Sequence, residues 1–205
     1  MTIELIYQDS DLIVTNKPSG LLCVPGLSEP DNLFDRVKSE FKNARVVHRL
    51  DMATSGLVIF ALNHETQKGF TQLFEKRQMQ KEYCAEVYGK IEQQHGEIIS
   101  PMMCDWPQRP RQKIDWHEGK PAHTLYHVLE TKQESTRVKL KPITGRTHQL
   151  RLHMLQLGHP ILGDKFYNLE SSEKQASRLL LHAEELRFTH PISREVVQLS
   201  CPPTF

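Results

Sequence analysis

The stretch VVHRLDMATSGLVIFAL, residues 46–62, places three ionisable residues in front of a long apolar run. The three are His48, Arg49 and Asp51. The Thr-Ser-Gly triplet that follows them is typical of a tight turn. A short apolar run bounded by such a turn is typical of a strand that is buried on both faces. The sequence therefore predicts a buried strand over 55–62, with Asp51 at the turn that precedes it.

The same residues allow two interpretations of Asp51. An aspartate often caps a turn, and an exposed arginine such as Arg49 is common on any surface. Alternatively, Asp51 is a reactive carboxylate held at a point where the backbone is tightly constrained. These few residues do not choose between the structural and the functional interpretation.

Around this stretch, predicted strands outnumber predicted helices and do not alternate with them regularly. Strands are expected over 5–7, 12–14, 55–62, 81–89, 122–129, 136–141, 179–188 and 196–199. Helices are expected over 31–41 with Asp31 as the cap, over 64–79, and over 147–157. This pattern predicts an α+β fold with a mixed, mostly antiparallel central sheet and flanking helices. Two lobes are expected, roughly 1–90 and 91–205.

Composition favours a globular protein that acts in the cytoplasm. Of the 205 residues, 38% are hydrophobic and 25% are charged, and the longest apolar run is too short to cross a bilayer. The first ten residues contain no basic residue, so we expect no secretory signal. The four cysteines are widely separated and the histidines follow no ligand spacing, so no metal site and no cofactor are predicted.

The charge distribution points to one local surface. The net charge is only +1, yet no acidic residue occurs from Ser135 to Gly163. The basic residues of this segment are Arg137, Lys139, Lys141, Arg146 and Arg151. The bias predicts phosphate contacts, although a solvated face that lacks acids is the alternative. A helix that starts at Thr147 would add backbone N–H groups near Arg146.

Tyr83 and Arg151 are candidate partners for Asp51. Tyr83 lies on the apolar side of its predicted strand, where a buried hydroxyl needs a hydrogen-bond partner. Arg151 lies at the margin of the apolar stripe of its predicted helix and needs a carboxylate, for which Asp51 is one candidate. Such a pair would keep the aspartate ionised, as a nucleophilic carboxylate requires.

These residues resemble one enzyme family. HRLDMATSG at 48–56 is similar to the signature of the RluA-type pseudouridine synthases, whose aspartate is catalytic. Further matching segments follow in the family's order: NKPSGL at 16–21, KEY at 81–83, GRTHQLRLHM at 145–154, HPILGDKFY at 159–167 and LLLHAEEL at 179–186. The resemblance implies a single pseudouridine synthase domain over 1–205, with a catalytic cleft between its lobes. No S4-type RNA-binding domain is expected.

The resemblance also implies roles for the candidate residues. Asp51 would act on the base or on C1′ of a uridine, and Arg151 would pair with it. Tyr83 would stack on the uracil or act as a base, with core packing as the alternative. The uridine must leave the RNA stack, so Arg49 is expected to fill the vacated space while His48 orients the motif.

The expected partner is structured RNA, without a membrane or an obligate protein partner. The segment CDWPQRPRQK at 104–113 and the chain length resemble the dual-specificity branch of the family. That branch modifies stem-loops of 23S rRNA and of tRNA anticodon arms. We expect RNA contacts from Lys141 and Arg146 and from three residues of the proline-rich segment: Arg109, Arg111 and Lys113. Trp106 and Trp116 either add contacts or, as we expect, pin that segment to the core.

Three alternatives stand beside this function. A related synthase would act on rRNA alone or on tRNA alone. A glycoside hydrolase would need two acids beside the scissile bond, and Asp51 has no acidic companion in the motifs. A catalytically silent RNA-binding module would be indicated by the loss of Asp51 or Tyr83, and both are present.

Overall fold

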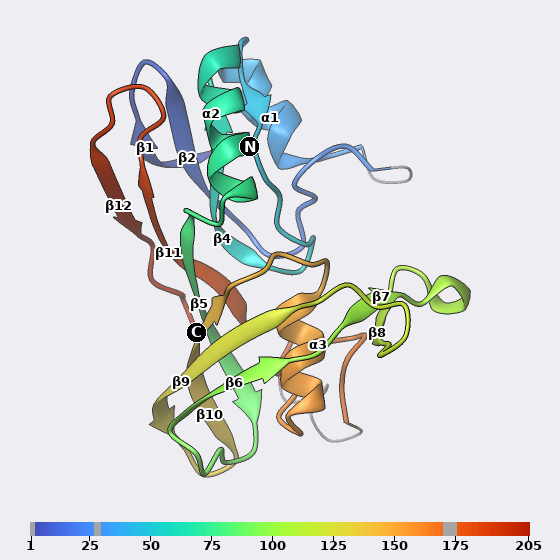
Figure 1. The fold of residues 1–205 in the computed structure, drawn as a ribbon. Helices are drawn as coiled ribbons and strands as arrows, with labels where there is room; N and C mark the ends of the chain where they lie inside the picture. Colours follow the sequence, from blue (N-terminus) through green and yellow to red (C-terminus); the bar gives the residue numbers. More distant parts are fainter. Residues whose placement is uncertain (1–2, 27–29, 170–175) are drawn as a thin grey trace. The chain divides into compact units, whose positions relative to one another are not determined.

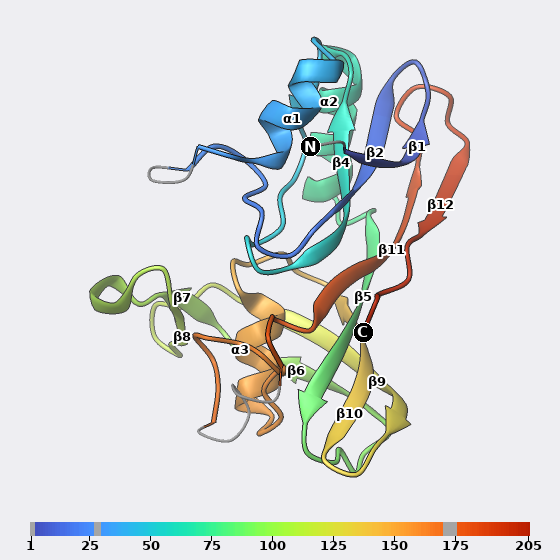
Figure 2. The ribbon, with the colours of Figure 1, turned by 180° about the vertical axis from the view of Figure 1, so that it is seen from behind.

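The computed structural model describes residues 3–26, 30–169 and 176–205, and it divides the chain into two compact units (Figures 1 and 2). Unit 1 contains the chain up to Lys81 together with His182–Thr204, and unit 2 contains Glu82–Leu181 and Phe205. The division differs from the two predicted lobes in two respects: the boundary follows Lys81 rather than residue 90, and the last strands of the chain belong to the first unit. Among the described residues, no helix has the length and apolar character needed to cross a membrane.

Unit 1 is a sheet covered by helices. Its strands are β1 (Glu4–Gln8), β2 (Leu12–Lys17), β3 (Arg45–Val46), β4 (Ser55–Ala61), β11 (Leu181–Thr189) and β12 (Val196–Ser200). They run in the order β1-β2-β4-β11, with β3 paired to β4 and β12 paired to β11. Only the β4–β11 pair is parallel. The helices are α1 (Leu33–Glu40) and α2 (His64–Glu75).

The predicted buried strand is confirmed as β4. All seven of its residues are buried, and α2 packs against it (Figure 1). Leu57 and Ile59 contribute to a core that also contains Phe70 of α2 and Phe188 of β11. The rings of Phe70 and Phe188 meet edge to face, with centroids 5.2 Å apart.

The helix boundaries of unit 1 differ in detail from the expected ones. The cap of α1 is Asn32, whose side chain accepts from the Asp35 N–H at 2.9 Å, whereas Asp31 was expected in that position. Asp31 instead pairs with Arg36. Helix α2 ends at Glu75 rather than 79, since the left-handed conformation of Arg77 (φ +55°) interrupts it.

Unit 2 contains a second antiparallel arrangement. Its strands are β5 (Gln80–Tyr88), β6 (His95–Ile99), β7 (Met102–Cys104), β8 (Gln112–Ile114), β9 (His123–Thr131) and β10 (Ser135–Pro142). The order is β5-β10-β9-β6, and β7 and β8 form a separate hairpin. Among the described residues of this unit, one α-helix, α3 (Gln149–Gln156), accompanies the strands, and a short 3₁₀ helix, η1 (Trp106–Gln108), lies in the hairpin. The strand-rich, largely antiparallel architecture confirms the α+β prediction.

Two expectations for unit 2 need correction. Helix α3 begins two residues later than expected, because His148 adopts a left-handed conformation (φ 55°, ψ 17°). The helix start therefore does not lie at Thr147, where the docking of a phosphate was expected. The tryptophans do not pin the hairpin, because Trp106 is 61% exposed and Trp116 is 70% exposed. Met102 is buried there instead.

Candidate active site

Asp51 lies half-buried in the loop that leads into β4. Its main-chain carbonyl accepts a hydrogen bond from the Thr54 N–H at 3.1 Å, which closes the predicted turn. Gly56 then adopts a φ of +113°, and a Cβ at this position would lie 2.4 Å from the carbonyl oxygen of Ala183 on β11. Glycine is thus required at 56 both by its conformation and by the close approach of β11.

The segment 16–21, which begins at the end of β2, is hydrogen-bonded to the Asp51 loop. The carbonyl of Met52 accepts from the Lys17 ammonium at 3.0 Å and from the Gly20 N–H at 2.9 Å. The Ser19 hydroxyl donates to the Ala53 carbonyl at 2.7 Å. The NKPSGL and HRLDMATSG segments, separate in the sequence, therefore form one local structure.

Lys17 is the residue of this structure that sequence analysis missed. Its side chain is fully buried, and its ammonium also donates to the carbonyls of Pro18 (2.9 Å) and Leu21 (2.7 Å). Burial lowers the pKa of Lys17 to about 8, although the negative charge of Asp51 acts in the opposite direction. A positive charge thus lies within electrostatic range of the candidate carboxylate. The only signal in the sequence was a lysine three residues after the predicted apolar strand 12–14, within the NKPSGL segment.

His48 takes part in the local backbone pairing. Because β3 pairs with β4 over only two residues, the N–H of Ile59 is free to bond elsewhere, and it donates to Nε2 of His48 at 3.0 Å. Burial, with the Lys81 charge as a smaller cause, lowers the pKa of His48 to about 3, so the ring is neutral at pH 7. This is the geometry of an orienting residue. Arg49 beside it is exposed, as an RNA-contacting side chain would be.

Arg151 forms a buried ion pair with Asp164 inside unit 2. Two hydrogen bonds of 2.7 Å join the guanidinium to the carboxylate, and the side chains are 4% and 0% exposed. Asp164 also accepts from the N–H groups of Phe166 (2.8 Å) and Tyr167 (3.1 Å). The guanidinium carbon lies 5.2 Å from the centroid of each of these two rings. Arg151 is thus held by a partner that sequence analysis did not identify.

Tyr167 connects this ion pair to the β7–β8 hairpin. Its hydroxyl accepts from the Gln112 N–H at 2.6 Å and lies 2.9 Å from Nδ1 of His148. Tyr83, on β5, is half-buried and pairs with Leu140 of β10. Asp51 belongs to unit 1, whereas Tyr83 and Arg151 belong to unit 2, and their convergence on one nucleotide stays a prediction.

Two basic side chains of the segment 135–163 are paired with carboxylates rather than available for RNA. Arg137 pairs with Glu86 at 3.1 Å and Lys139 with Glu82 at 3.0 Å, because β5 lies beside β10. Lys141 and Arg146 have no carboxylate within ion-pair distance among the described residues, and the Arg146 guanidinium contacts the Pro121 carbonyl at 3.2 Å. Lys141 and Arg146 are therefore the candidates of this segment for phosphate contacts.

The three basic residues of the hairpin differ in their surroundings. Lys113 lies 3.3 Å from Asp115. The Arg109 guanidinium lies over the Trp106 ring at 4.4 Å, and that of Arg111 lies 5.8 Å from the Phe166 centroid. An arginine that stacks on an exposed ring can still reach a nucleotide, whereas Lys113 is partly neutralised.

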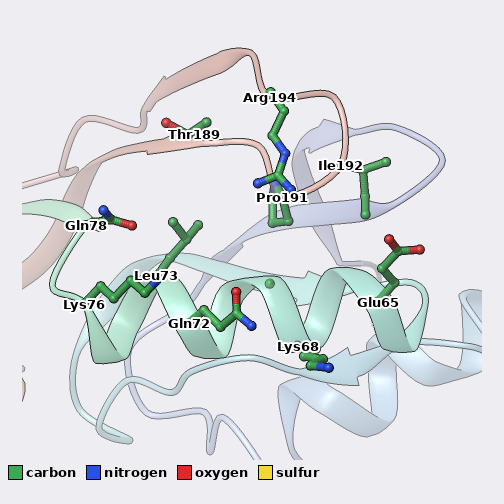
Figure 3. Close-up of a pocket in the computed structure, with 11 residues that line it drawn as sticks. Glu65, Lys68, Gln72, Leu73, Lys76, Gln78, Thr189, Pro191, Ile192 and Arg194 are labelled. Carbon is green, nitrogen blue, oxygen red and sulfur yellow. The ribbon is translucent and has the colours of Figure 1, made fainter.

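A hollow of about 530 Å³ lies in unit 1 between α2 and the turn that joins β11 to β12 (Figure 3). Three cationic side chains and one acidic side chain are among those that line it: Lys68, Lys76, Arg194 and Glu65. None of the predicted site residues lines this hollow, so it is a surface feature separate from the Asp51 loop.

One cluster in unit 1 has the composition of a metal site. Ligand atoms of Asp9, Asp11 and His190 lie within 4.8 Å of one another. Nδ1 of His190 accepts from the N–H groups of Ile192 (3.2 Å) and Ser193 (3.0 Å), which places the ring proton on Nε2. Nε2 lies 3.2 Å from the Asp9 carboxylate, so the protonated side of the ring faces that carboxylate, which suits an electrostatic contact rather than coordination of a cation.

Comparison with known proteins covers both units. The sequence profile described as RNA pseudouridylate synthase matches residues 11–156. A protein of Pasteurella multocida, "Dual-specificity RNA pseudouridine synthase RluA", is 50% identical in a match 207 residues long that covers 99% of this chain and 94% of that protein. The Escherichia coli K12 protein of the same name is 47% identical over 206 residues, with the same two coverages.

Solved structures of pseudouridylate synthases are also similar to this chain. Human RNA Pseudouridylate Synthase Domain Containing 1 superposes with a TM-score of 0.86 at 31% identity, over 100% of this chain and 84% of that chain. Its counterpart Domain Containing 4 gives 0.80 at 27% identity, over 98% and 89%. Together with the Asp51 loop and its motif order, these matches show that the chain belongs to the RNA pseudouridylate synthase family.

Proposed function

We propose that this RNA pseudouridine synthase isomerises uridines in stem-loops of both 23S rRNA and the anticodon arm of tRNAs. The observation that carries the proposal is the near full-length identity of 50% and 47% to two dual-specificity synthases. Synthases restricted to rRNA or to tRNA remain the alternative. We also propose that the enzyme acts in the cytoplasm, with these RNAs as its partners.

In the proposed reaction the N1–C1′ bond of uridine breaks, the uracil rotates, and C5 becomes bonded to C1′. C5 loses its proton and N1 gains one, so the reaction is redox-neutral and consumes no co-reactant. Asp51 is the proposed catalytic carboxylate, acting at the base or at C1′. The contacts from Lys17, Ser19 and Gly20 to its loop support this role, since a reacting group needs a fixed position.

Arg151 is the proposed electrostatic partner of Asp51. Its bonds to Asp164 and its contacts with Phe166 and Tyr167 hold the guanidinium in one orientation. We further propose that Tyr83 stacks on the uracil or removes the C5 proton, and that Arg49 occupies the place of the flipped uridine in the RNA stack. Lys141 and Arg146 are the proposed phosphate contacts.

The test is Asp51→Asn, assayed by tritium release from stem-loop RNA that carries 5-tritiated uridine. We expect no turnover, with RNA affinity within about tenfold of wild type because the side chain keeps its shape. Asp11→Asn is the matched control, because Asp11 is another half-buried aspartate of unit 1. Turnover that survives in the Asp51 variant would refute the assignment. Arg151→Met should also reduce turnover, and normal rates there would remove Arg151 from the mechanism.

The substrate range has its own test. Pseudouridines are mapped by mass spectrometry in rRNA and tRNA from cells that lack the gene. Loss from one tRNA position and from one 23S rRNA hairpin, both restored by the wild-type gene, is the expected result. Loss from a single RNA class would support the restricted alternative instead.

A further inference from the structure

Both tryptophans of the chain lie exposed within or directly after the β7–β8 hairpin. The sequence contains two tryptophans, and Trp106 is 61% exposed and Trp116 is 70% exposed. Trp106 belongs to η1 between β7 and β8, and Trp116 follows β8 by two residues. Tryptophan is a side chain that folding normally buries to a large extent, so two such exposures in one short segment need an explanation.

The backbone that carries these rings is well held. At the tip, the Asp105 N–H donates to the Arg111 carbonyl at 2.9 Å, and the Arg111 N–H donates to the Gln108 carbonyl at 3.0 Å. The Asp115 carboxylate accepts from the N–H groups of His117 (3.0 Å) and Glu118 (2.9 Å), which fixes the turn around Trp116. The rings are thus presented from ordered turns.

The surroundings of the rings suit a nucleobase. The Arg109 guanidinium lies 4.4 Å from the Trp106 centroid. Arg111 adds positive charge to the hairpin, and Lys120 adds positive charge to the segment that follows it. Bases in single-stranded segments stack on aromatic rings and on guanidinium planes, and they do so with little dependence on base identity. The acidic residues Asp105, Asp115 and Glu118 offset much of the charge, so stacking rather than ionic attraction is the dominant property.

The hairpin is also connected to the residue that we place beside the reacting nucleotide. Gln112 of β8 donates its N–H to the Tyr167 hydroxyl at 2.6 Å, and the Tyr167 ring lies 5.2 Å from the Arg151 guanidinium. Strand β8 also packs against α3, the helix that carries Arg151. An RNA segment on the hairpin would therefore occupy a defined position relative to Arg151.

We propose that the exposed rings of Trp106 and Trp116, one before and one after strand β8, each stack on unpaired nucleotides of the RNA substrate, outside the uridine that reacts. We call the two rings together the stacking platform. This inference rests on the proposed function, because it takes the RNA of that reaction as the ligand. The platform contributes to RNA affinity and to the choice of stem-loop. It does not contribute to the chemical step.

Intrinsic fluorescence tests the proposal directly, because both tryptophans of the chain belong to the stacking platform. The Asp51→Asn enzyme is titrated with stem-loop RNA that has an unpaired loop, and with a fully paired duplex of equal length. We expect the stem-loop to quench the emission and the duplex to leave it nearly unchanged. Trp106→Phe and Trp116→Phe then assign the signal to each ring.

Steady-state kinetics of the tryptophan variants, made in the enzyme that retains Asp51, provide a second test. Trp106→Ala and Trp116→Ala should each raise KM by about tenfold, in keeping with the loss of one stacked base, with kcat within about twofold of wild type. The phenylalanine variants should recover most of the affinity, because they keep a ring. Ile99→Ala is the matched control, since Ile99 is a 58% exposed apolar residue of β6 in the same unit.

Salt separates stacking from phosphate contact. Between about 50 and 200 mM salt, the KM ratio of Trp106→Ala to wild type should stay constant, because stacking releases no counterions. The ratio for Arg146→Gln should shrink over the same range. A tryptophan penalty that disappears with salt would overturn the stacking inference.

The two proposals fail in different ways. Normal turnover on a stem-loop, with no fluorescence change and unchanged KM in both alanine variants, would overturn the platform and leave the proposed function intact. Quenching by stem-loop RNA without pseudouridine formation by wild type would overturn the proposed function and leave the platform.

Discussion

Replacement of Asp164 by asparagine tests how Arg151 is held. The carboxylate makes two bonds of 2.7 Å to the guanidinium and accepts two backbone N–H groups, and its side chain is fully buried. Asparagine keeps the shape and one oxygen for the N–H groups but removes the charge. The buried guanidinium then loses the bidentate carboxylate that this ion pair provides.

Removal of one member of a buried ion pair costs about 3–5 kcal/mol, which is a large share of the roughly 5–15 kcal/mol stability of a domain. Asp164→Ala should cost at least about 1 kcal/mol more, because the N–H groups of Phe166 and Tyr167 would also lose their acceptor. Turnover by the folded enzyme should fall as well, since the orientation of Arg151 is no longer fixed.

Urea unfolding followed by far-ultraviolet circular dichroism is the appropriate assay, because exposed tryptophans report unfolding poorly. Asp115→Asn is the matched control. Asp115 also accepts two backbone N–H groups and pairs with a lysine, but its side chain is 20% exposed and that of Lys113 is 49% exposed. The control should lose far less stability than Asp164→Asn, because solvent screens an exposed pair. A loss below about 1 kcal/mol in Asp164→Asn, with tritium release unchanged, would refute the reasoning.

Three further predictions concern unit 1. Gly56→Ala should lower the melting temperature sharply and reduce soluble yield, since its Cβ would lie 2.4 Å from the Ala183 carbonyl oxygen; a stable variant would contradict the close approach. For Lys17, the folded pKa of about 8 lies below the unfolded value of 10.5, so the unfolded state binds more protons between these values and stability rises with pH. The unfolding free energy of wild type relative to Lys17→Met should therefore rise by about 2 kcal/mol from pH 7 to pH 9.5, and a flat difference would argue against a buried ammonium. Arg49→Ala should slow turnover on stem-loop RNA with little change in melting temperature, and an unchanged rate would count against its stacking role.

The surroundings of Asp51 were predictable because their determinants are local. Small residues after Asp51 predict a turn, and the apolar run that follows predicts β4. An unbroken apolar run predicts a buried strand without knowledge of which elements cover it. The cap of α1 was misassigned by one residue because Asp31 and Asn32 are both good caps. Only the structure shows that Asn32 bonds to the helix while Asp31 pairs with Arg36.

Contacts between distant residues were not predictable. Asp164 is 13 residues from Arg151, beyond any helical spacing, and nothing in the sequence joins them. The segment 135–163 is free of acids along the chain, yet the pairing of β5 with β10 places Glu82 and Glu86 beside its basic residues. Lys17 was missed because lysine is almost never fully buried. Its sequence neighbours also do not reveal that three main-chain carbonyls accept hydrogen bonds from its ammonium group.

The return of residues 182–204 to unit 1 has a consequence for biosynthesis. A ribosome makes β4 and α2 early, but their apolar side chains need Phe188 and its neighbours on β11, which are translated more than one hundred residues later. Unit 2, apart from Phe205, is one continuous segment that ends before β11 has been made. We therefore expect the middle of the chain to mature first, while the amino-terminal segment waits for the carboxyl-terminal one and depends on chaperones in the interval.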